Sequence, residues 1–292
     1  MEYETVIYEK EGHIARITLN SPHNLNAFPF PGQGGLNDDF HAALDEAEDD
    51  DDIKVVVIKG AGRAFSAGHD LTKVGYVYGM TDQGKRPNQR VRYKVDRKNF
   101  GECFQRMFLF PKITIAQVHG YCYAEGLIYV ECCDLAIAAE DTKFAHTEAR
   151  LGGAAGVGLL PILFMTIGMK NANKLMFTGE TIDGKEAERI GLVNSAVPID
   201  QLEDEVNKLA DIISRLPRDG IAVGKAARTL AFDSLGISSG FNFSWIFHAA
   251  GTNIHWEPDE YNFFKARRDK GITDAIHKRD EYYTSGESKL LG

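Results

Sequence analysis

Two short turns in the sequence carry the residue types that could stabilise a developing negative charge. They read Phe65-Ser66-Ala67-Gly68-His69-Asp70 and Gly120-Tyr121-Cys122-Tyr123-Ala124-Glu125-Gly126. Each follows a short apolar run, and a strand that stops at such a turn leaves backbone N–H groups unpaired. Two N–H groups that converge on one point form an oxyanion hole, which holds the enolate of a polarised carbonyl. A Ser-Ala-Gly turn taken alone is usually only a turn, so the interpretation depends on the elements around it.

The elements that must position these turns alternate between strand and helix over residues 1–200. Apolar runs predict buried strands over 53–58 and 113–118, directly before the two turns, as in a parallel sheet that is covered on both faces. Further strands are expected over 3–9, 13–19 and 135–139, and helices near 97–109, 126–132, 159–168, 170–177, 183–190 and 200–215. From Asp219 onward the pattern is helical and rich in aromatic residues. The order of elements predicts an α/β protein with an all-helical C-terminal segment.

Length and composition limit the class of protein. With 292 residues, 43% of them hydrophobic, the chain can bury one substantial core. The formal net charge of -9 argues against nucleic acid as a partner, because phosphate binding favours a basic face. A basic stretch over 85–98 is either a solvated helix face or a surface that attracts an anionic ligand such as a nucleotide-bearing substrate.

Targeting and metal-binding signals are missing from the sequence. No apolar run approaches the roughly 20 residues that span a bilayer, and the acidic start Met1-Glu2-Tyr3-Glu4 is no secretory signal. The four cysteines do not form a Cys-x-x-Cys pair with a histidine cluster, so no metal site is expected. The glycine-rich stretch 152–158 lacks the Gly-Lys-Ser/Thr ending of a phosphate loop. We expect a reduced, cytoplasmic protein with no membrane partner.

Read in order, these segments resemble the crotonase superfamily, which is the enoyl-CoA hydratase/isomerase family. The matching segments cover about residues 1–215 and are Ile17-Thr18-Leu19-Asn20-Ser21-Pro22, Asn24-Leu25-Asn26-Ala27, Ala64-Phe65-Ser66-Ala67-Gly68-His69-Asp70-Leu71, Pro111-Lys112-Ile113-Thr114-Ile115-Ala116, Gly120-Tyr121, Cys133-Asp134-Leu135-Ala136-Ile137-Ala138, Phe144-Ala145-His146-Thr147-Glu148, Thr178-Gly179-Glu180 and Ala187-Glu188-Arg189-Ile190-Gly191-Leu192-Val193-Asn194. The resemblance implies an acyl-CoA-binding core over 1–215, built as a spiral of ββα units. It implies a helical region over 216–292 that builds a homotrimer or a dimer of trimers and covers the pocket. The implied substrate is an acyl-CoA thioester, with coenzyme A as part of it and no separate cofactor.

The resemblance also places the two backbone donors of the oxyanion hole. In the family these are the N–H after the Phe-Ser and a second N–H in the turn after the Gly-Tyr. In this chain the positions are Ala67 and Glu125, or Gly126 if the register differs by one residue. The usual glycine triplet is altered to Ala124-Glu125-Gly126. A Glu125 carboxylate would oppose catalysis unless it points away or is protonated.

Hydratases of the family use two glutamates about twenty residues apart, and this chain matches only one of them. Glu148 matches the second, and we expect it to be the acid or base that moves a proton of the acyl chain. Ile128 stands at the first position and cannot transfer a proton. One glutamate suffices for an isomerase or a lyase. Hydration stays open if Glu125, one helical turn before Ile128, or a substrate-bound water replaces the missing group.

Further residues are candidates for contacts with the substrate. His69 could touch the pantetheine or phosphates of coenzyme A or face solvent, and His146 could tune Glu148, contact the acyl chain or be structural. Asp70 is expected to fix its turn by bonding to nearby backbone N–H groups. The other candidates are Ser66 in the first turn, Tyr76 and Tyr78 in the segment that lines the acyl pocket of relatives, and Lys265, which either meets the coenzyme A phosphates or is solvated.

The resemblance leaves three functional classes. The first is an acyl-CoA isomerase, lyase or hydratase that works through an oxyanion-stabilised enolate. The second is an acyl-CoA hydrolase, and the third is a catalytically silent protein that keeps the fold and the pocket. Ile128 and the altered glycine triplet favour the silent protein, whereas Glu148 and the Ser-Ala-Gly turn favour an enzyme.

Overall fold

The computed structural model describes residues 2–73, 87–152, 160–251 and 255–290, with 284–290 as backbone only. Within these residues the strands form a six-stranded sheet in the order β1-β2-β3-β5-β7-β9 and a three-stranded sheet in the order β4-β6-β8. The large sheet contains β1 (Val6–Glu11), β2 (Ile14–Leu19), β3 (Val55–Gly60), β5 (Ile113–Val118), β7 (Leu135–Ala139) and β9 (Ser195–Val197). β1 is antiparallel to β2, and the other pairs of these strands are parallel.

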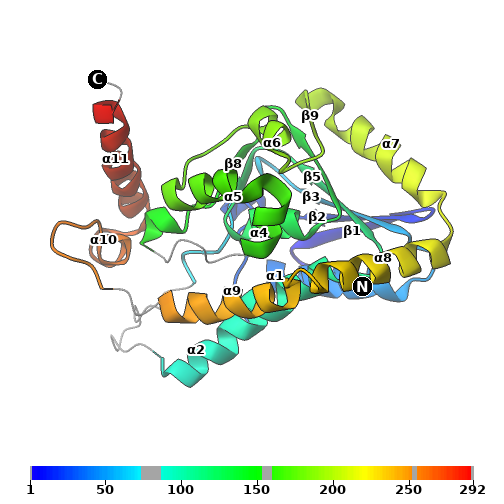
Figure 1. The fold of residues 1–292 in the computed structure, drawn as a ribbon, viewed down its shortest axis with the longest axis horizontal. Helices are drawn as coiled ribbons and strands as arrows, with labels where there is room; N and C mark the ends of the chain where they lie inside the picture. Colours follow the sequence, from blue (N-terminus) through cyan, green and yellow to red (C-terminus); the bar gives the residue numbers. More distant parts are fainter. Residues whose placement is uncertain (1, 74–86, 153–159, 252–254, 291–292) are drawn as a thin grey trace.

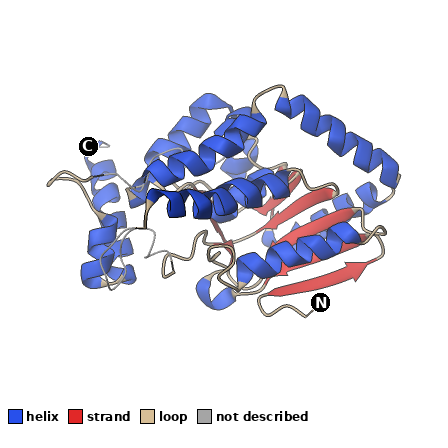
Figure 2. Cartoon of the chain, turned by 90° about the horizontal axis from the view of Figure 1, so that it is seen from below, coloured by secondary structure: helices blue, strands red, loops and turns tan. Residues whose placement is uncertain are grey.

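The large sheet is buried on both faces, which explains its apolar strands. Val55 and Val57 of β3 belong to a cluster with α7 (Leu202–Ser214) on one face. Val56 and Ile58 belong to the main core on the other face, which includes residues of α1 (Leu36–Asp49). Successive side chains of a strand alternate between faces, so a strand covered on both sides is apolar throughout. Figure 2 shows the sheet between these helices.

Three strands of the large sheet are each followed by a short one that belongs to the second sheet. β3 leads into β4 (Ala64–Ser66), β5 into β6 (Tyr121–Tyr123) and β7 into β8 (Lys143–Ala145). The short strands pair in parallel with one another, and α4 (Glu125–Cys132) follows β6 directly. The repeat of long strand, short strand and helix confirms the predicted α/β spiral of ββα units.

The remaining helices surround this spiral (Figure 1). α5 (Leu160–Thr178) is interrupted at Gly168, where φ is 75°, in agreement with the two helices predicted over 159–168 and 170–177. The other elements are the 3-10 helices η1 (Pro22–Asn24), η4 (Ala149–Leu151) and η5 (Ile199–Gln201), the π-helix η3 (Arg97–Cys103), and the helices α2 (Gln89–Asp96), α3 (Phe104–Phe108), α6 (Gly184–Ile190), α8 (Arg218–Asp233), α9 (Ile237–Gly251), α10 (Phe263–Lys270) and α11 (Ile272–Leu290).

The region over 216–292 is helical where the structure describes it. α9 packs against α2 and η3 of the core, while α10 and α11 pack together at one end of the molecule (Figure 1). None of the described helices has both the length and the apolar character that crossing a membrane requires. The division at residue 215 and the role of this region in oligomerisation stay predictions.

Candidate active site

The two turns singled out in the sequence lie against each other. β4 and β6 are parallel neighbours, so the turns that follow them leave the small sheet side by side. A Cβ added to Gly126 would lie 2.6 Å from the Ser66 Cβ, and one added to Gly68 would lie 2.7 Å from the Tyr123 carbonyl oxygen. Real Cβ atoms essentially never come within 3.0 Å of such neighbours. Glycine at both positions therefore lets the two backbones share one small space.

The Ala67 N–H, which was the predicted first oxyanion donor, already donates a hydrogen bond within the protein. It donates to the Leu25 carbonyl oxygen at 2.9 Å. The Gly68 N–H that follows it donates to Ser66 Oγ at 3.0 Å. The prediction for Ala67 therefore does not fit the structure, because the segment over 25–28 runs beside the turn and accepts a hydrogen bond from it.

The His69 N–H has no acceptor among the described residues. Phe28 and His69 form a parallel bridge, in which the Phe28 N–H donates to the Gly68 carbonyl and the Asp70 N–H donates to the Phe28 carbonyl. In such a bridge the N–H of the central residue points away from its partner strand. The first turn therefore directs the His69 N–H away from 25–28.

The second turn offers the N–H groups at the start of α4. Those of Glu125 and Gly126 have no acceptor within the described chain, because the first N–H groups of a helix lack intrahelical partners. The Glu125 nitrogen faces the first turn: it lies 3.2 Å from the point where a Cβ on Gly68 would stand. The two backbone donors that the structure brings together are thus the N–H groups of His69 and Glu125. The role of the Glu125 N–H as the second oxyanion donor stays a prediction.

The side chains of these same two residues are paired. His69 Nδ1 and Glu125 Oε2 share a short hydrogen bond. The His69 ring lies against Phe30, with ring centroids 4.4 Å apart, and near Phe100, at 5.8 Å. Glu125 is 2% exposed. Its Oε1 atom and His69 Nε2 are buried and have no hydrogen-bond partner among the described residues. The Glu125 carboxylate therefore turns to His69, and His69 does not simply face solvent.

A second acid–histidine pair lies beside Glu148. His146 Nε2 and Glu131 Oε1 are 2.7 Å apart, and His146 Nδ1 lies 3.8 Å from Glu148 Oε2. The side chains of Glu131 and His146 are 1% and 6% exposed, whereas that of Glu148 is 20% exposed. Of these three groups, the Glu148 carboxyl is the one that a substrate can reach most readily.

Burial and charge set the protonation of this second group of residues. Burial lowers the pKa of His146, but the charge of Glu131, its hydrogen bond and the charge of Glu148 raise it more, to about 9. Burial raises the pKa of Glu148, and the charge of His146 partly opposes this. The charges of Glu131 and Glu125 raise the Glu148 pKa further. A rise in the pKa of a carboxyl makes its protonated form more available, so the group can serve as an acid as well as a base.

Ile128 does not enter the site as an acid–base group. It is 1% exposed and belongs to the main apolar core. The sequence placed Glu125 and Glu131 one turn on either side of Ile128. In the structure each of these two carboxylates pairs with a histidine. The roles of these pairs were missed by sequence reasoning, because their partners lie 56 and 15 residues away along the chain. The available signal was the presence of two glutamates on a short, otherwise apolar helix.

Two other candidates from the sequence hold the first turn. Ser66 Oγ donates to the Asn26 carbonyl oxygen at 2.7 Å and accepts from the next glycine, and the side chain is fully buried. Asp70 accepts hydrogen bonds from the N–H and the hydroxyl of Thr72, at 2.9 and 2.6 Å. Asp70 thus fixes its turn as expected. The Ser66 hydroxyl makes both of its hydrogen bonds to the protein backbone, which indicates a structural role.

The remaining candidates lie away from these groups. Tyr76 and Tyr78 are outside the described residues. Lys265 is exposed on α10, and its contact with coenzyme A stays a prediction. Among the described side chains, no cluster of three His, Cys, Asp or Glu residues could hold a metal ion.

A basic groove of about 630 Å³ opens between α2, η3 and the loop that follows Phe30. The cations that line it are Arg90, Lys94 and Lys98. No described carboxylate pairs with these three side chains, whereas Arg92 of the same helix is buried and pairs with Asp96 at 2.7 Å. The groove therefore suits an anionic group.

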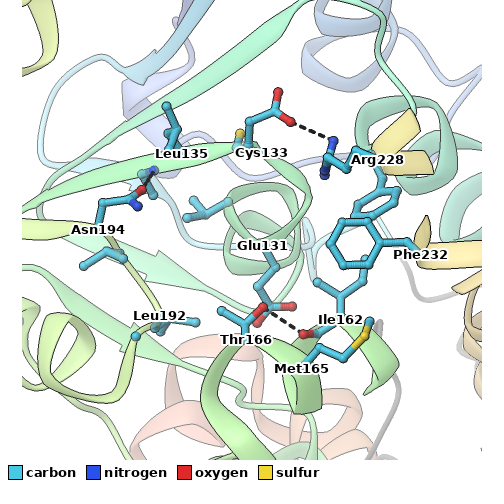
Figure 3. Close-up of a pocket in the computed structure, with 16 residues that line it drawn as sticks. Glu131, Cys133, Leu135, Ile162, Met165, Thr166, Leu192, Asn194, Arg228 and Phe232 are labelled. Atoms are coloured by element: carbon cyan, nitrogen blue, oxygen red, sulfur yellow. Dashed lines mark hydrogen bonds and ion pairs between the residues drawn. The ribbon is translucent and has the colours of Figure 1, made fainter. Parts of the chain in front are cut away.

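Another pocket, of about 210 Å³, lies at the C-terminal end of α4 (Figure 3). Its main charged groups are already paired, since Asp134 binds both Lys225 and Arg228 at 2.7 Å. Glu131 lines this pocket, but its carboxylate is bound to His146. These contacts join α8 to the core, so the chemistry is better placed at the two turns.

The chain is similar to known proteins over most of its length. The family model described as Enoyl-CoA hydratase/isomerase matches residues 9–238. A probable enoyl-CoA hydratase of Mycobacterium tuberculosis is 32% identical over 285 residues, which cover 97% of this chain and 99% of that protein. A short-chain-enoyl-CoA hydratase of Clostridium acetobutylicum is 33% identical over 227 residues, covering 74% of this chain and 78% of that protein.

Solved structures show the same fold. An enoyl-CoA hydratase/isomerase from Xanthobacter autotrophicus superposes with a TM-score of 0.82 at 29% identity, covering 96% of this chain and 99% of the other. An enoyl-CoA hydratase from Mycobacterium smegmatis gives a TM-score of 0.81 at 26% identity, covering 95% and 94%. The similarity extends over nearly the whole chain and includes both turns.

Proposed function

The chain belongs to the enoyl-CoA hydratase/isomerase family, and from that premise we propose that it acts on an acyl-CoA thioester through an enolate. The enolate oxygen would be held by the backbone N–H groups of His69 and Glu125. Glu148 would be the group that removes or delivers the proton at the acyl chain. One observation carries the proposal: two N–H groups without acceptors stand on two backbones that glycine brings into contact.

The N–H pair supplies the electrostatic part of the reaction. When a proton leaves C2, negative charge moves onto the thioester oxygen, and donors fixed in advance stabilise it without reorganisation. The loss of one such donor typically costs about 3–4 kcal/mol of transition-state stabilisation. The segment over 25–28 holds the first turn through the bridge at Phe28, and the start of α4 holds the second.

Glu148 supplies the proton transfer. Its side chain is partly exposed, and burial raises the pKa of its carboxyl, which favours its use as a general acid as well as a base. The protonated His146 beside it limits that rise. A single carboxylate that takes a proton from one carbon and returns it to another completes a double-bond isomerisation, and it also serves a lyase.

Coenzyme A is part of the substrate in this proposal, and no further cofactor is invoked. The basic groove beside Phe30 is the described surface that best suits the phosphates of such a substrate. An acyl-CoA hydrolase and a silent acyl-CoA-binding protein are the alternatives, and the burial of Ile128 in the core is the observation that favours the silent protein.

The test is proton exchange at C2 of a panel of saturated and unsaturated CoA thioesters in heavy water, followed by mass spectrometry. Wild type and Glu148→Gln are compared under the same conditions. Deuterium incorporation by wild type that the variant loses supports the proposal. Thioester binding without exchange in wild type would contradict it and favour the silent protein or a hydrolase that forms no enolate.

A further inference from the structure

We propose that His69 is a second acid–base group of this site, acting through its Nε2 atom, and that Glu125 is the residue that orients it. The inference rests on the proposed function, because it uses the same oxyanion hole and Glu148. It specifies the reaction as addition of water to an α,β-unsaturated acyl-CoA thioester. The dyad would take the place of the glutamate that family hydratases carry at the position of Ile128.

The hydrogen bond to Glu125 fixes which nitrogen of His69 can react. Glu125 Oε2 accepts from Nδ1, so in the neutral ring the lone pair lies on Nε2. A buried carboxylate that holds one ring nitrogen orients the imidazole and stabilises the cation that forms when the other nitrogen takes a proton. The dyad therefore has the arrangement of a general base with its orienting carboxylate.

The surroundings of His69 leave Nε2 without a protein partner. This atom is buried and has no hydrogen bond within the part of the chain that the structure describes, an arrangement that costs stability unless a ligand or water meets it. Phe30 and Phe100 flank the ring and restrict its rotation. A structural histidine would be expected to have both ring nitrogens satisfied. The unsatisfied nitrogen here is rigidly held beside the backbone donor of its own residue.

Glu125 connects the dyad to the proposed oxyanion hole. Glu125 begins α4 and its backbone N–H is the second oxyanion donor of the proposal. Its charge also contributes to the raised pKa of Glu148. A thioester held at the two N–H groups would have the dyad and Glu148 as its neighbouring titratable groups.

The chemistry balances with water as the only co-reactant. His69 Nε2 takes a proton from water while the water oxygen bonds to C3 of the enoyl chain. The electrons of the C2–C3 double bond move to give an enolate, whose oxygen is held by the N–H groups of His69 and Glu125. Glu148 then delivers its proton to C2 and the 3-hydroxyacyl thioester leaves. Solvent removes the proton from His69 and returns one to Glu148, which restores the starting state.

Two reactions measured in the same variants test the assignment. Hydration of crotonyl-CoA is followed by the loss of enoyl absorbance, and C2 exchange of butyryl-CoA in heavy water is followed by mass spectrometry. His69→Gln should lower hydration by about 10²–10³-fold and lower C2 exchange far less, because the side chain that acts on water is lost while the backbone N–H that holds the enolate oxygen stays. Glu148→Gln should lose both reactions.

Further variants separate a chemical role from a structural one. Added imidazole should restore part of the hydration by His69→Ala, because a small base can occupy the vacated space. Glu125→Gln should lower hydration and move its pH profile, since the carboxylate no longer stabilises the imidazolium. His41→Gln is the matched control: His41 is a half-buried histidine bonded to Tyr129, outside the site, and both reactions should stay unchanged.

The outcomes distinguish this inference from the proposed function. If wild type exchanges the C2 proton but hydrates no enoyl-CoA, the inference fails while the enolate proposal stands. Equal hydration by wild type and His69→Gln would also overturn it, as would loss of both reactions in His69→Ala without any rescue by imidazole. If wild type neither exchanges nor hydrates, both proposals fail.

Discussion

The two histidine–glutamate pairs at the ends of α4 look alike but leave different atoms available. Glu125 begins the helix and pairs with His69, while Glu131 near its end pairs with His146. Both carboxylates are buried, and each has one oxygen that finds no hydrogen bond among the residues described. The difference lies in the histidines. His69 has an unpartnered Nε2 atom, whereas the second nitrogen of His146 lies 3.8 Å from Glu148.

This comparison shows that burial and pairing alone do not define a catalytic group. The first pair has a nitrogen that can exchange a proton with a ligand. The second pair keeps its proton, since the pKa of His146 is raised to about 9, and so places a positive charge beside Glu148. One pair is suited to move a proton and the other to set the pKa of a neighbour.

The largest effect is expected at Glu148, the carboxyl beside the second pair. Glu148→Gln should lower C2 exchange by about 10³-fold, because the amide cannot accept or return a proton. Exchange rates by mass spectrometry give the measurement. Glu180→Gln, at a half-buried glutamate paired with Lys174, is the control and should keep the wild-type rate. If C2 exchange survives in Glu148→Gln, Glu148 is not the base, and the His69 pair becomes the candidate for removing the C2 proton.

The second pair should make the stability of the protein depend on pH. The folded-state pKa of His146, about 9, lies above the ordinary value of about 6.5, so its contribution is complete below pH 6.5. It is lost as pH rises from about 6.5 to 9, by about 3 kcal/mol in all. Urea titrations compare wild type with a Glu131→Gln, His146→Gln double variant, in which this slope should be absent. Parallel pH profiles would show that the pair does not hold a proton.

The contact between the turns should be sensitive to a single methyl group. Gly126→Ala would place a Cβ 2.6 Å from that of Ser66, so the backbones of the turns must separate. We expect a loss of about 1–3 kcal/mol of stability and about 10²-fold in C2 exchange, since a displacement of about 1 Å can cost that much. Gly224→Ala, on α8 with open space around it, is the control. Unchanged exchange in Gly126→Ala would remove the oxyanion role from this contact.

The smallest effect concerns backbone strain at Ala124, the residue before Glu125. Ala124 has φ 47° and ψ −119°, a conformation that glycine adopts more easily. Ala124→Gly should therefore raise the free energy of unfolding by about 1 kcal/mol and the melting temperature by a few degrees. Ala222→Gly, at an exposed position inside α8, should instead lower it by about 1 kcal/mol. A drop in both variants would show that the turn before Glu125 is not strained.

The fold was predictable where burial produced a continuous signal. The strands expected over 113–118 and 135–139 match Ile113–Val118 and Leu135–Ala139, because the sheet is covered on both faces and the runs are apolar throughout. The three-residue strands β4, β6 and β8 were not predicted, since a segment of that length has no measurable period. The π-helix over Arg97–Cys103 lies within the helix predicted near 97–109, and its pattern does not differ from that of an α-helix.

The site was predictable to the level of segments but not of atoms. Sequence reasoning predicted both turns and Glu148 as parts of the site, and it placed two glutamates around Ile128. The sequence predicted the Ala67 N–H as a donor. In the structure this N–H binds the Leu25 carbonyl, a contact that depends on tertiary packing and that the sequence pattern does not reveal. The pairing of each histidine with its glutamate depends on how β4 and β8 approach α4, which no local pattern contains.

The backbone origin of the two proposed donors has a consequence for how this site can change over evolution. Every residue except proline has an N–H, so the side chains at positions 69 and 125 can be replaced without removing a donor. At these two residues the backbone would stabilise the oxyanion and the side chain would serve proton transfer. A substitution therefore changes the second function and keeps the first. A lineage can gain, exchange or lose an acid–base group at these positions while the charge-stabilising geometry is inherited unchanged.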